Sequence, residues 1–228
     1  EPAKHYRLRA LGALALAGLL AGCTTPIGIR IANPREVQRY LTRSALTDAR
    51  PSDFSRTQLR RSDLLEAFDH EPDSALAKLH AAALAEDFPP DALFALTELS
   101  FLRAQETELQ AGYAAAVIYS YALLFPEGGR APLDELDPRE RIAADMYNRA
   151  LTSAFKRTKE GTLVLGGSGK IALPFGHIAV TRSPDMLHMS GTELYDLQPV
   201  AEIEVRGLRN RYRRPGIGAP LAAKTRPL

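Results

Sequence analysis

The residue whose position indicates its chemistry most clearly is Cys23, the single cysteine of the chain. Basic residues stand at positions 4, 7 and 9, and an uncharged run rich in Leu and Ala follows at 10–22. A basic stretch, an apolar stretch and then small residues is the order of a secretory signal peptide. The apolar run is too short to span a bilayer, which takes about 20 helical residues. The pattern therefore predicts a cleaved leader at 1–22, with Cys23 as the first residue of the mature protein.

The segment Leu20-Ala21-Gly22-Cys23 resembles the Leu-Ala-Gly-Cys box of bacterial lipoproteins. The resemblance implies acylation of Cys23, with membrane lipid as the partner of this end of the chain and a lipidated tether at 23–32. Thr24 follows the cysteine, and by resemblance to enteric lipoproteins the absence of Asp there indicates the outer membrane of a bacterial cell envelope. The alternative is a buried cysteine after an ordinary apolar helix.

The Gly-rich segment 166–170 has the composition of two enzyme motifs but the spacing of neither. A phosphate-binding loop requires Gly where Val164 stands and Ser or Thr where Ile171 stands. A hydrolase nucleophile elbow requires Gly where Lys170 stands. The segment is therefore predicted to be a turn between strands.

The remaining candidate groups also form no catalytic set. His177 and His188 flank Asp185, which is the pairing of a base with its orienting carboxylate, but no activated nucleophile accompanies them. The acidic segment 69–73 lacks the glycine and the bidentate glutamate of a calcium loop, and no zinc motif is present. His80, on the apolar face of a predicted helix, is expected to be a hydrogen-bonded structural histidine. We predict no catalytic residue, metal or cofactor in this chain, and the sequence leaves open whether it is part of an enzyme.

Five arginines lie close together near the C-terminal end of the sequence, with Tyr212 among them. One interpretation is contact with a phosphate or lipid headgroup, and the other is a solvated linker or a clamp onto carboxylates of a neighbouring domain. The full chain has 29 basic and 27 acidic residues, but 1–22 hold three of the former and one of the latter, which leaves 26 of each from Cys23 onward. A neutral chain gives no electrostatic reason to expect nucleic acid. The five arginines are Arg206, Arg209, Arg211, Arg213 and Arg214.

Apolar periodicity predicts a helical domain over 33–160, in which five or six helices stack as antiparallel pairs. Asn33-Pro34 and Asp137-Pro138 are N-cap and N1 pairs that begin two of these helices. The uncharged segment 109–126 is read as the central buried helix rather than as a membrane span, because it contains Gln, Ser and three tyrosines. The predicted helices cover 33–48, 52–68 in two pieces, 72 to a break at Phe88-Pro89, 91 to about 106, 109–126 and 137–159.

At Gly161 the pattern changes to that of a small antiparallel β region, predicted over 161–207. A hairpin is expected between 162–165 and 170–173, with further strands at 177–181 and 201–205. Residues 208–228 are expected to be a linker. The predicted fold class is thus α+β, with an antiparallel helical array followed by a small antiparallel β region.

Several segments together resemble the N-terminal half of large bacterial lipoproteins and exported proteins of the α/β-hydrolase superfamily. They are PDALFALTELSFL at 90–102, AAVIYSYALLFP at 115–126, AADMYNRAL at 143–151, LPFG at 173–176 and AEIEVRGLRNRYRRPGIGAPL at 201–221. The resemblance implies a helical region and a small β region that precede a serine-hydrolase domain, whose nucleophile elbow would lie beyond Leu228. None of the segments is a catalytic motif, so no catalytic residue is transferred.

Two functions follow as hypotheses. The first is the membrane-anchored, non-catalytic accessory region of an esterase- or lipase-like serine hydrolase, with the hydrolase domain of the same polypeptide as partner. The first residue is Glu and the chain ends without a closing element, so we expect a longer reading frame. The second is a complete non-enzymatic outer-membrane lipoprotein whose helical layer binds a partner protein.

Overall fold

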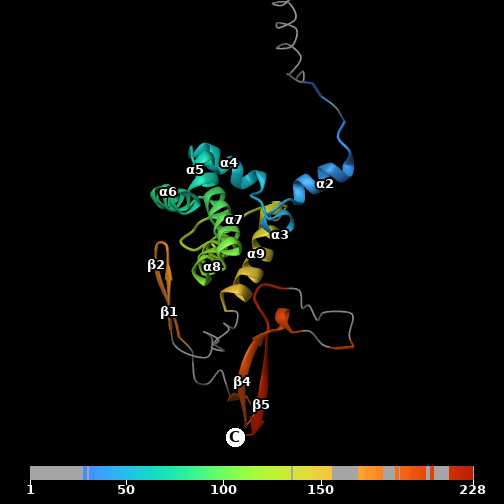
Figure 1. Cartoon of the computed structure of the whole chain (residues 1–228), viewed down its shortest axis with the longest axis vertical. Coiled ribbons are helices and arrows are strands. Elements are labelled where there is room, and N and C mark those ends of the chain that lie inside the picture. The colour runs from blue at the N-terminus through green and yellow to red at the C-terminus, as the bar shows by residue number, and fades with distance from the viewer. Residues whose placement is uncertain are drawn as a thin grey trace, which may run out of the picture. The chain divides into compact units, whose positions relative to one another are not determined.

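The computed structural model describes residues 28–29, 31–134, 136–155, 169–181, 188–189, 191–203, 206–207 and 216–227. It divides into two compact units, 1–41 and 42–228, each of which is described by itself. Its elements are a series of helices followed by two small antiparallel sheets (Figure 1). The predicted α+β class is confirmed.

Helix α2 (Pro34–Thr42) begins where the sequence predicted. The side chain of Asn33 accepts a hydrogen bond from the backbone N–H of Arg35 at 2.9 Å, and its carbonyl accepts from Glu36 and Val37. This arrangement satisfies donors that the first turn of a helix leaves free. The residues preceding the helix are fully exposed at Ile29 and Ile31.

The single helix predicted over 33–48 is wrong, because a new helix, α3 (Ala45–Asp48), begins at Ser44. The hydroxyl of Ser44 accepts from Leu46 N–H at 3.3 Å, and the hydroxyl of Thr47 accepts from Ser44 N–H at 3.0 Å. This reciprocal capping box favours a helix start over continuation. The two short helices predicted within 52–68 are present as α4 (Asp53–Arg61) and α5 (Leu65–His70).

Four longer helices form the rest of the helical region: α6 (Pro72–Ala85), α7 (Pro90–Thr107), α8 (Gln110–Leu124) and α9 (Pro138–Ala154). Proline at the first position of α6, α7 and α9 needs no intrahelical partner there and has the helical φ angle already. Helix α7 contacts α3, α4, α6, α8 and α9. Twelve of its 18 residues are buried, against six of 15 in α8. The central helix is therefore α7 and not, as predicted, the segment 109–126.

Helices α7 and α8 approach each other closely at Gly112. A Cβ atom at Gly112 would lie 2.8 Å from the Cβ of Ala104, which is nearer than packed carbons allow. The absence of a side chain at Gly112 thus permits the close approach of the two helices at this position. Helix α8 has α7, α9 and strand β1 as neighbours. No helix within the described residues is long and apolar enough to cross a membrane.

The first sheet pairs β1 (Gly169–Leu173) with β2 (Gly176–Val180) across a turn at Pro174 and Phe175. One strand of the hairpin predicted across the Gly-rich segment, 162–165, lies outside the described residues. The buried side chain of Ile171 packs with Ala114 and Ala154, which attaches this hairpin to helices α8 and α9.

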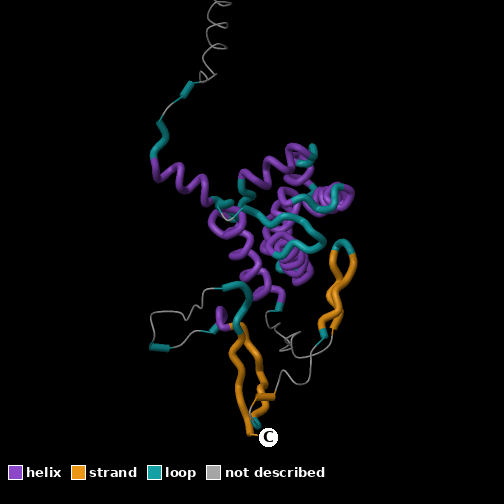
Figure 2. The backbone as a smooth tube through the Cα atoms, turned by 180° about the vertical axis from the view of Figure 1, so that it is seen from behind, coloured by secondary structure: helices purple, strands orange, loops and turns teal. Residues whose placement is uncertain are grey.

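The second sheet has the order β3–β4–β5 and consists of β3 (His188–Met189), β4 (Thr192–Pro199) and β5 (Leu221–Pro227) (Figures 1 and 2). The strand predicted at 201–205 is wrong at its start, where Val200–Glu202 form a 3-10 helix. Residues 221–227, which the sequence predicted to be linker, pair with β4 from Thr192↔Pro227 to Pro199↔Leu221. Pairing with a distant strand satisfies the backbone groups of this segment, and no local signal reveals it.

Candidate functional site

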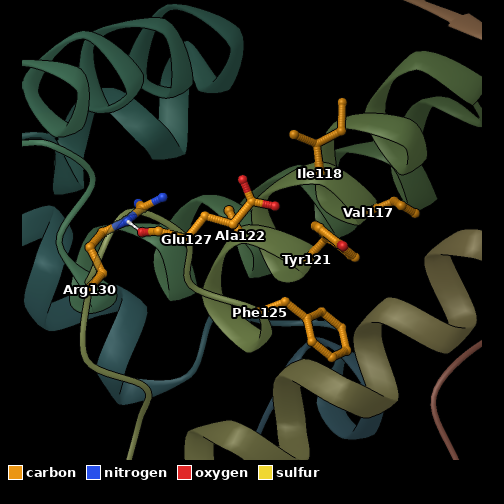
Figure 3. Close-up of a pocket in the computed structure, with 7 residues that line it drawn as sticks. All are labelled: Val117, Ile118, Tyr121, Ala122, Phe125, Glu127 and Arg130. Carbon is orange, nitrogen blue, oxygen red and sulfur yellow. Dashed lines mark hydrogen bonds between the residues drawn. The ribbon is translucent and has the colours of Figure 1, made fainter.

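The candidate site is an apolar groove along the outer face of α8, with a volume of about 290 Å³ (Figure 3). Its two aromatic side chains are exposed, Tyr121 at 46% and Phe125 at 40%. Exposed apolar surface of this kind commonly marks a contact site for a partner. The groove is lined by Val117, Ile118, Tyr121, Ala122, Phe125, Glu127 and Arg130.

The helical repeat explains why these side chains lie together. Residues four apart lie on the same side of a helix, so Val117, Tyr121 and Phe125 share one face of α8 or its end. The rings of Tyr121 and Phe125 are 4.9 Å apart, and Tyr147 of α9 lies 6.4 Å from Tyr121. Burial is the main cause that raises the pKa of Tyr147 above its usual range. This aromatic row is an apolar surface on which a partner's side chains can pack.

One end of the groove is formed by the loop after α8. The Nε of Arg130 donates to the backbone carbonyl of Glu127 at 3.2 Å, which holds the loop in a tight turn (Figure 3). Gly128 and Gly129 have φ angles of 70° and 82°, where residues with a Cβ are disfavoured. The groove thus combines an apolar floor with one acidic residue, Glu127, and one basic residue, Arg130, at its end.

Several charged side chains elsewhere on the helices form ion pairs that join one helix to another. Arg139 binds both Asp137, the N-cap of α9, and Asp91, in the first turn of α7, and its guanidinium lies over the ring of Phe54 at 5.5 Å. Asp91 also accepts from Arg61 of α4 at 2.8 Å. Hydrogen bonds from Arg139 are the main cause that holds the pKa of Asp91 and of Asp137 below the usual range. These groups position helices rather than a substrate.

A second ion pair joins α6 to α7. Arg103 donates to both carboxylate oxygens of Asp73 at 2.8 Å and also approaches Glu106 at 3.4 Å. Its bidentate hydrogen bonding lowers the pKa of Asp73. Asp73 belongs to the acidic segment 69–73, and its observed partner is this arginine.

Glu98 is a buried carboxylate that sequence reasoning missed. Its side chain is fully buried in α7 and accepts four hydrogen bonds, from the backbone N–H groups of Ala45 (2.8 Å) and Ser52 (2.9 Å) and from the hydroxyls of Ser52 (2.6 Å) and Ser55 (2.5 Å). Burial raises its pKa, and the serine hydrogen bonds oppose that rise. Glu98 ties the N-termini of α3 and α4 to the central helix.

His80 has the structural role that the sequence predicted. Its Nδ1 lies 2.8 Å from the hydroxyl of Tyr119, and its ring stacks on Phe175 with centroids 4.8 Å apart. Burial lowers the pKa of His80 and raises that of Tyr119. Phe175 lies in the β1–β2 turn, so this cluster fixes the tip of the hairpin against α6 and α8.

The sequence-predicted site residues lie largely outside the described residues. Those groups are the lipid box Leu20, Ala21, Gly22 and Cys23, and the arginines Arg209, Arg211, Arg213 and Arg214. Arg206 is described and exposed.

The two histidines that flank Asp185 belong to different sheets. His177 is an exposed residue of β2, His188 belongs to β3, and Asp185 is outside the described residues. Within the part of the chain that the structure describes, no three His, Cys, Asp or Glu side chains are grouped to hold a metal ion.

Comparison with known proteins gives no match: no family model, no curated protein and no solved structure is significantly similar to this chain.

Proposed function

We propose that this chain is the lipid-anchored, non-catalytic accessory region of an esterase- or lipase-like serine hydrolase, and that the groove on α8 is where its helical layer meets the hydrolase domain. The observation that carries the proposal is the pair of exposed aromatic side chains in the groove, Tyr121 and Phe125, on one face of a helical layer. Exposed apolar surface of this kind supports a role in binding a partner. The lipid box around Cys23 and the resemblance to hydrolase-associated lipoproteins support the membrane-anchored role.

The reading frame beyond codon 228 is the direct test of the hydrolase. An in-frame continuation with a Gly-x-Ser-x-Gly elbow supports the proposal, and a stop codon or a continuation without that elbow refutes it. Membrane attachment is tested separately by labelling cells with radioactive palmitate. We expect label in the wild type and none in Cys23→Ser, with recovery of the wild type in the outer-membrane fraction.

The role of the groove is tested in the full-length polypeptide with p-nitrophenyl butyrate as substrate. Tyr121→Glu places a charge among the apolar side chains and is expected to lower hydrolase activity or its thermal stability. Leu84→Glu is the matched control, because Leu84 is 61% exposed on α6 and lies outside the groove. Equal effects of both substitutions would show that the groove has no special role.

The same groove also favours a second candidate, an outer-membrane lipoprotein that binds a separate partner protein. This candidate predicts that residues 24–228 expressed alone are stable and monodisperse. The accessory-region proposal predicts association through the exposed apolar face instead. Light scattering of that fragment distinguishes the two.

A further inference from the structure

The carboxamide of Asn148 in α9 holds a segment that lies about 70 residues further along the chain. Its Nδ2 donates to the carbonyl of Gly216 at 2.9 Å, and its Oδ1 accepts from the backbone N–H of Gly218 at 2.5 Å. The side-chain amide offers one donor group and one acceptor group. It therefore pairs with a backbone carbonyl and a backbone N–H of the segment, as the backbone of a neighbouring strand would. Gly218 has φ 122°, a conformation that residues with a Cβ rarely adopt.

The segment held by Asn148 leads into strand β5 of the β3–β4–β5 sheet. Two residues beyond Gly218, the carbonyl of Pro220 accepts from Val200 N–H at 2.9 Å, and β5 then pairs with β4. The sheet has its own internal ties, in which Lys224 pairs with Asp196 at 2.6 Å and Arg226 pairs with Glu193 at 2.7 Å. A displacement of 216–218 from α9 would therefore move the sheet as a body.

The two sheets are attached to the helices in different ways. The β1–β2 hairpin contributes the buried Ile171 to one hydrophobic cluster and packs Leu173 and Phe175 against the other. Among the described residues, none between 188 and 227 belongs to either cluster. Among its described residues, the β3–β4–β5 sheet therefore contributes to neither cluster, whereas the hydrogen bonds of Asn148 tie the segment before β5 to α9.

We propose that Asn148 is a clasp that holds the β3–β4–β5 sheet on α9, and that opening the clasp lets the sheet move while the helices stay folded. Two hydrogen bonds of ordinary net strength shift such an equilibrium by roughly 5- to 150-fold. The open form is then a minor state that a partner on the sheet or on α9 can select. The clasp is a conformational device, and it does not depend on the identity of that partner.

Hydrogen exchange of the full chain, read by mass spectrometry on peptic fragments, tests the clasp. In Asn148→Ala we expect exchange at 216–221 to accelerate by roughly 5- to 150-fold, while fragments of α7 and α8 keep their wild-type rates. Small-angle scattering should show a larger radius of gyration. Gln110→Ala is the matched control, since its amide donates to the carbonyl of Ala154 at 2.5 Å and does not touch the sheet. Unchanged exchange at 216–221, or the same acceleration in the control, would overturn the proposal.

A second variant makes the clasp respond to pH. In Asn148→Asp, a protonated carboxyl still has a donor and an acceptor for Gly216 and Gly218, whereas the carboxylate has acceptors alone. We expect slow exchange at 216–221 well below a pH of about 4 and fast exchange above it. The wild type, corrected for the intrinsic pH dependence of exchange, should show no such step. If the variant shows no step either, the clasp is refuted without any appeal to misfolding.

Discussion

Substitution of Glu98 should destabilise the helical region more than substitution of any exposed carboxylate. In Glu98→Ala the backbone N–H groups of Ala45 and Ser52 lose their acceptor, and neither group can rotate toward another partner. A buried donor without a partner costs about 1–3 kcal/mol. The two serine hydroxyls can turn to other acceptors, so we count the two backbone groups and expect a loss of about 2–6 kcal/mol.

The charge-neutral variant Glu98→Gln separates the hydrogen bonds from the charge. The amide oxygen can accept from Ser52 and Ser55, but its NH₂ group then faces the N–H of Ala45, so one donor remains unpaired. The unpaired N–H of Ala45 costs about 1–3 kcal/mol of stability. Removal of the buried charge offsets part of this cost. We therefore expect Glu98→Gln to be more stable than Glu98→Ala.

The pH dependence of stability has a definite sign. Burial raises the pKa of Glu98 above its value in the unfolded chain, so the folded state binds the proton more tightly. The stabilisation from this proton is fully present below a pH of about 4.5 and is lost as the pH rises through the folded pKa. The stability of the wild type relative to Glu98→Gln should therefore fall as the pH rises from about 4.5 to above the pKa of Glu98 in the folded state, and it should be constant at higher pH.

Urea unfolding of both proteins at a series of pH values measures this difference. The opposite slope, with the wild type gaining on Glu98→Gln as pH rises, would show that the hydrogen bonds outweigh burial and that the assigned direction is wrong. A loss of less than about 1 kcal/mol in Glu98→Ala would refute the hydrogen-bond reasoning itself.

Three further predictions concern the packing of the helices. Gly112→Ala should cost about 1–3 kcal/mol in urea unfolding, because the new Cβ would lie 2.8 Å from that of Ala104. Burial lowers the pKa of His80 in the folded state, so the stability that is present above a pH of about 6.5 should be lost as the pH falls through that lowered pKa. In thermal unfolding, His80→Phe should remove this pH dependence. Arg139→Lys keeps the charge but loses the bidentate geometry and the contact with Phe54, so its melting temperature should fall toward that of Arg139→Ala rather than match the wild type.

Local signals in the sequence were sufficient where the structure depends on local contacts. The starts of α2 and α9 follow from Asn33-Pro34 and Asp137-Pro138, whose side chains cap the backbone two residues away. The break at Ser44 depends on a local signal too, but the apolar pattern over 33–48 suggested one continuous helix. The capping hydrogen bonds of Ser44 outweigh that pattern.

Contacts between distant residues could not be predicted in this way. Glu98 lies 43–53 residues from its three partners, and its own helix shows no sign of a carboxylate acceptor. Strand β5 pairs with β4 across more than 20 residues, and its sequence lacks the alternation that marks a strand with one buried face. The groove on α8 was missed for a related reason, because a segment without charges predicts burial on all sides, and the partial exposure of Tyr121 depends on where the neighbouring helices lie.

Some side chains of the helical region join helices to one another, and others are exposed in the groove. Arg139, Arg103 and Glu98 are each engaged in contacts that join helices, so their removal would be expected to change stability before it changes recognition. Tyr121 and Phe125 contribute less to the core because each is substantially exposed. A substitution in the aromatic row should therefore separate binding from folding, whereas one in an ion pair should not. This asymmetry makes Tyr121→Glu, compared with Leu84→Glu, the more informative measurement of what the helical layer contacts.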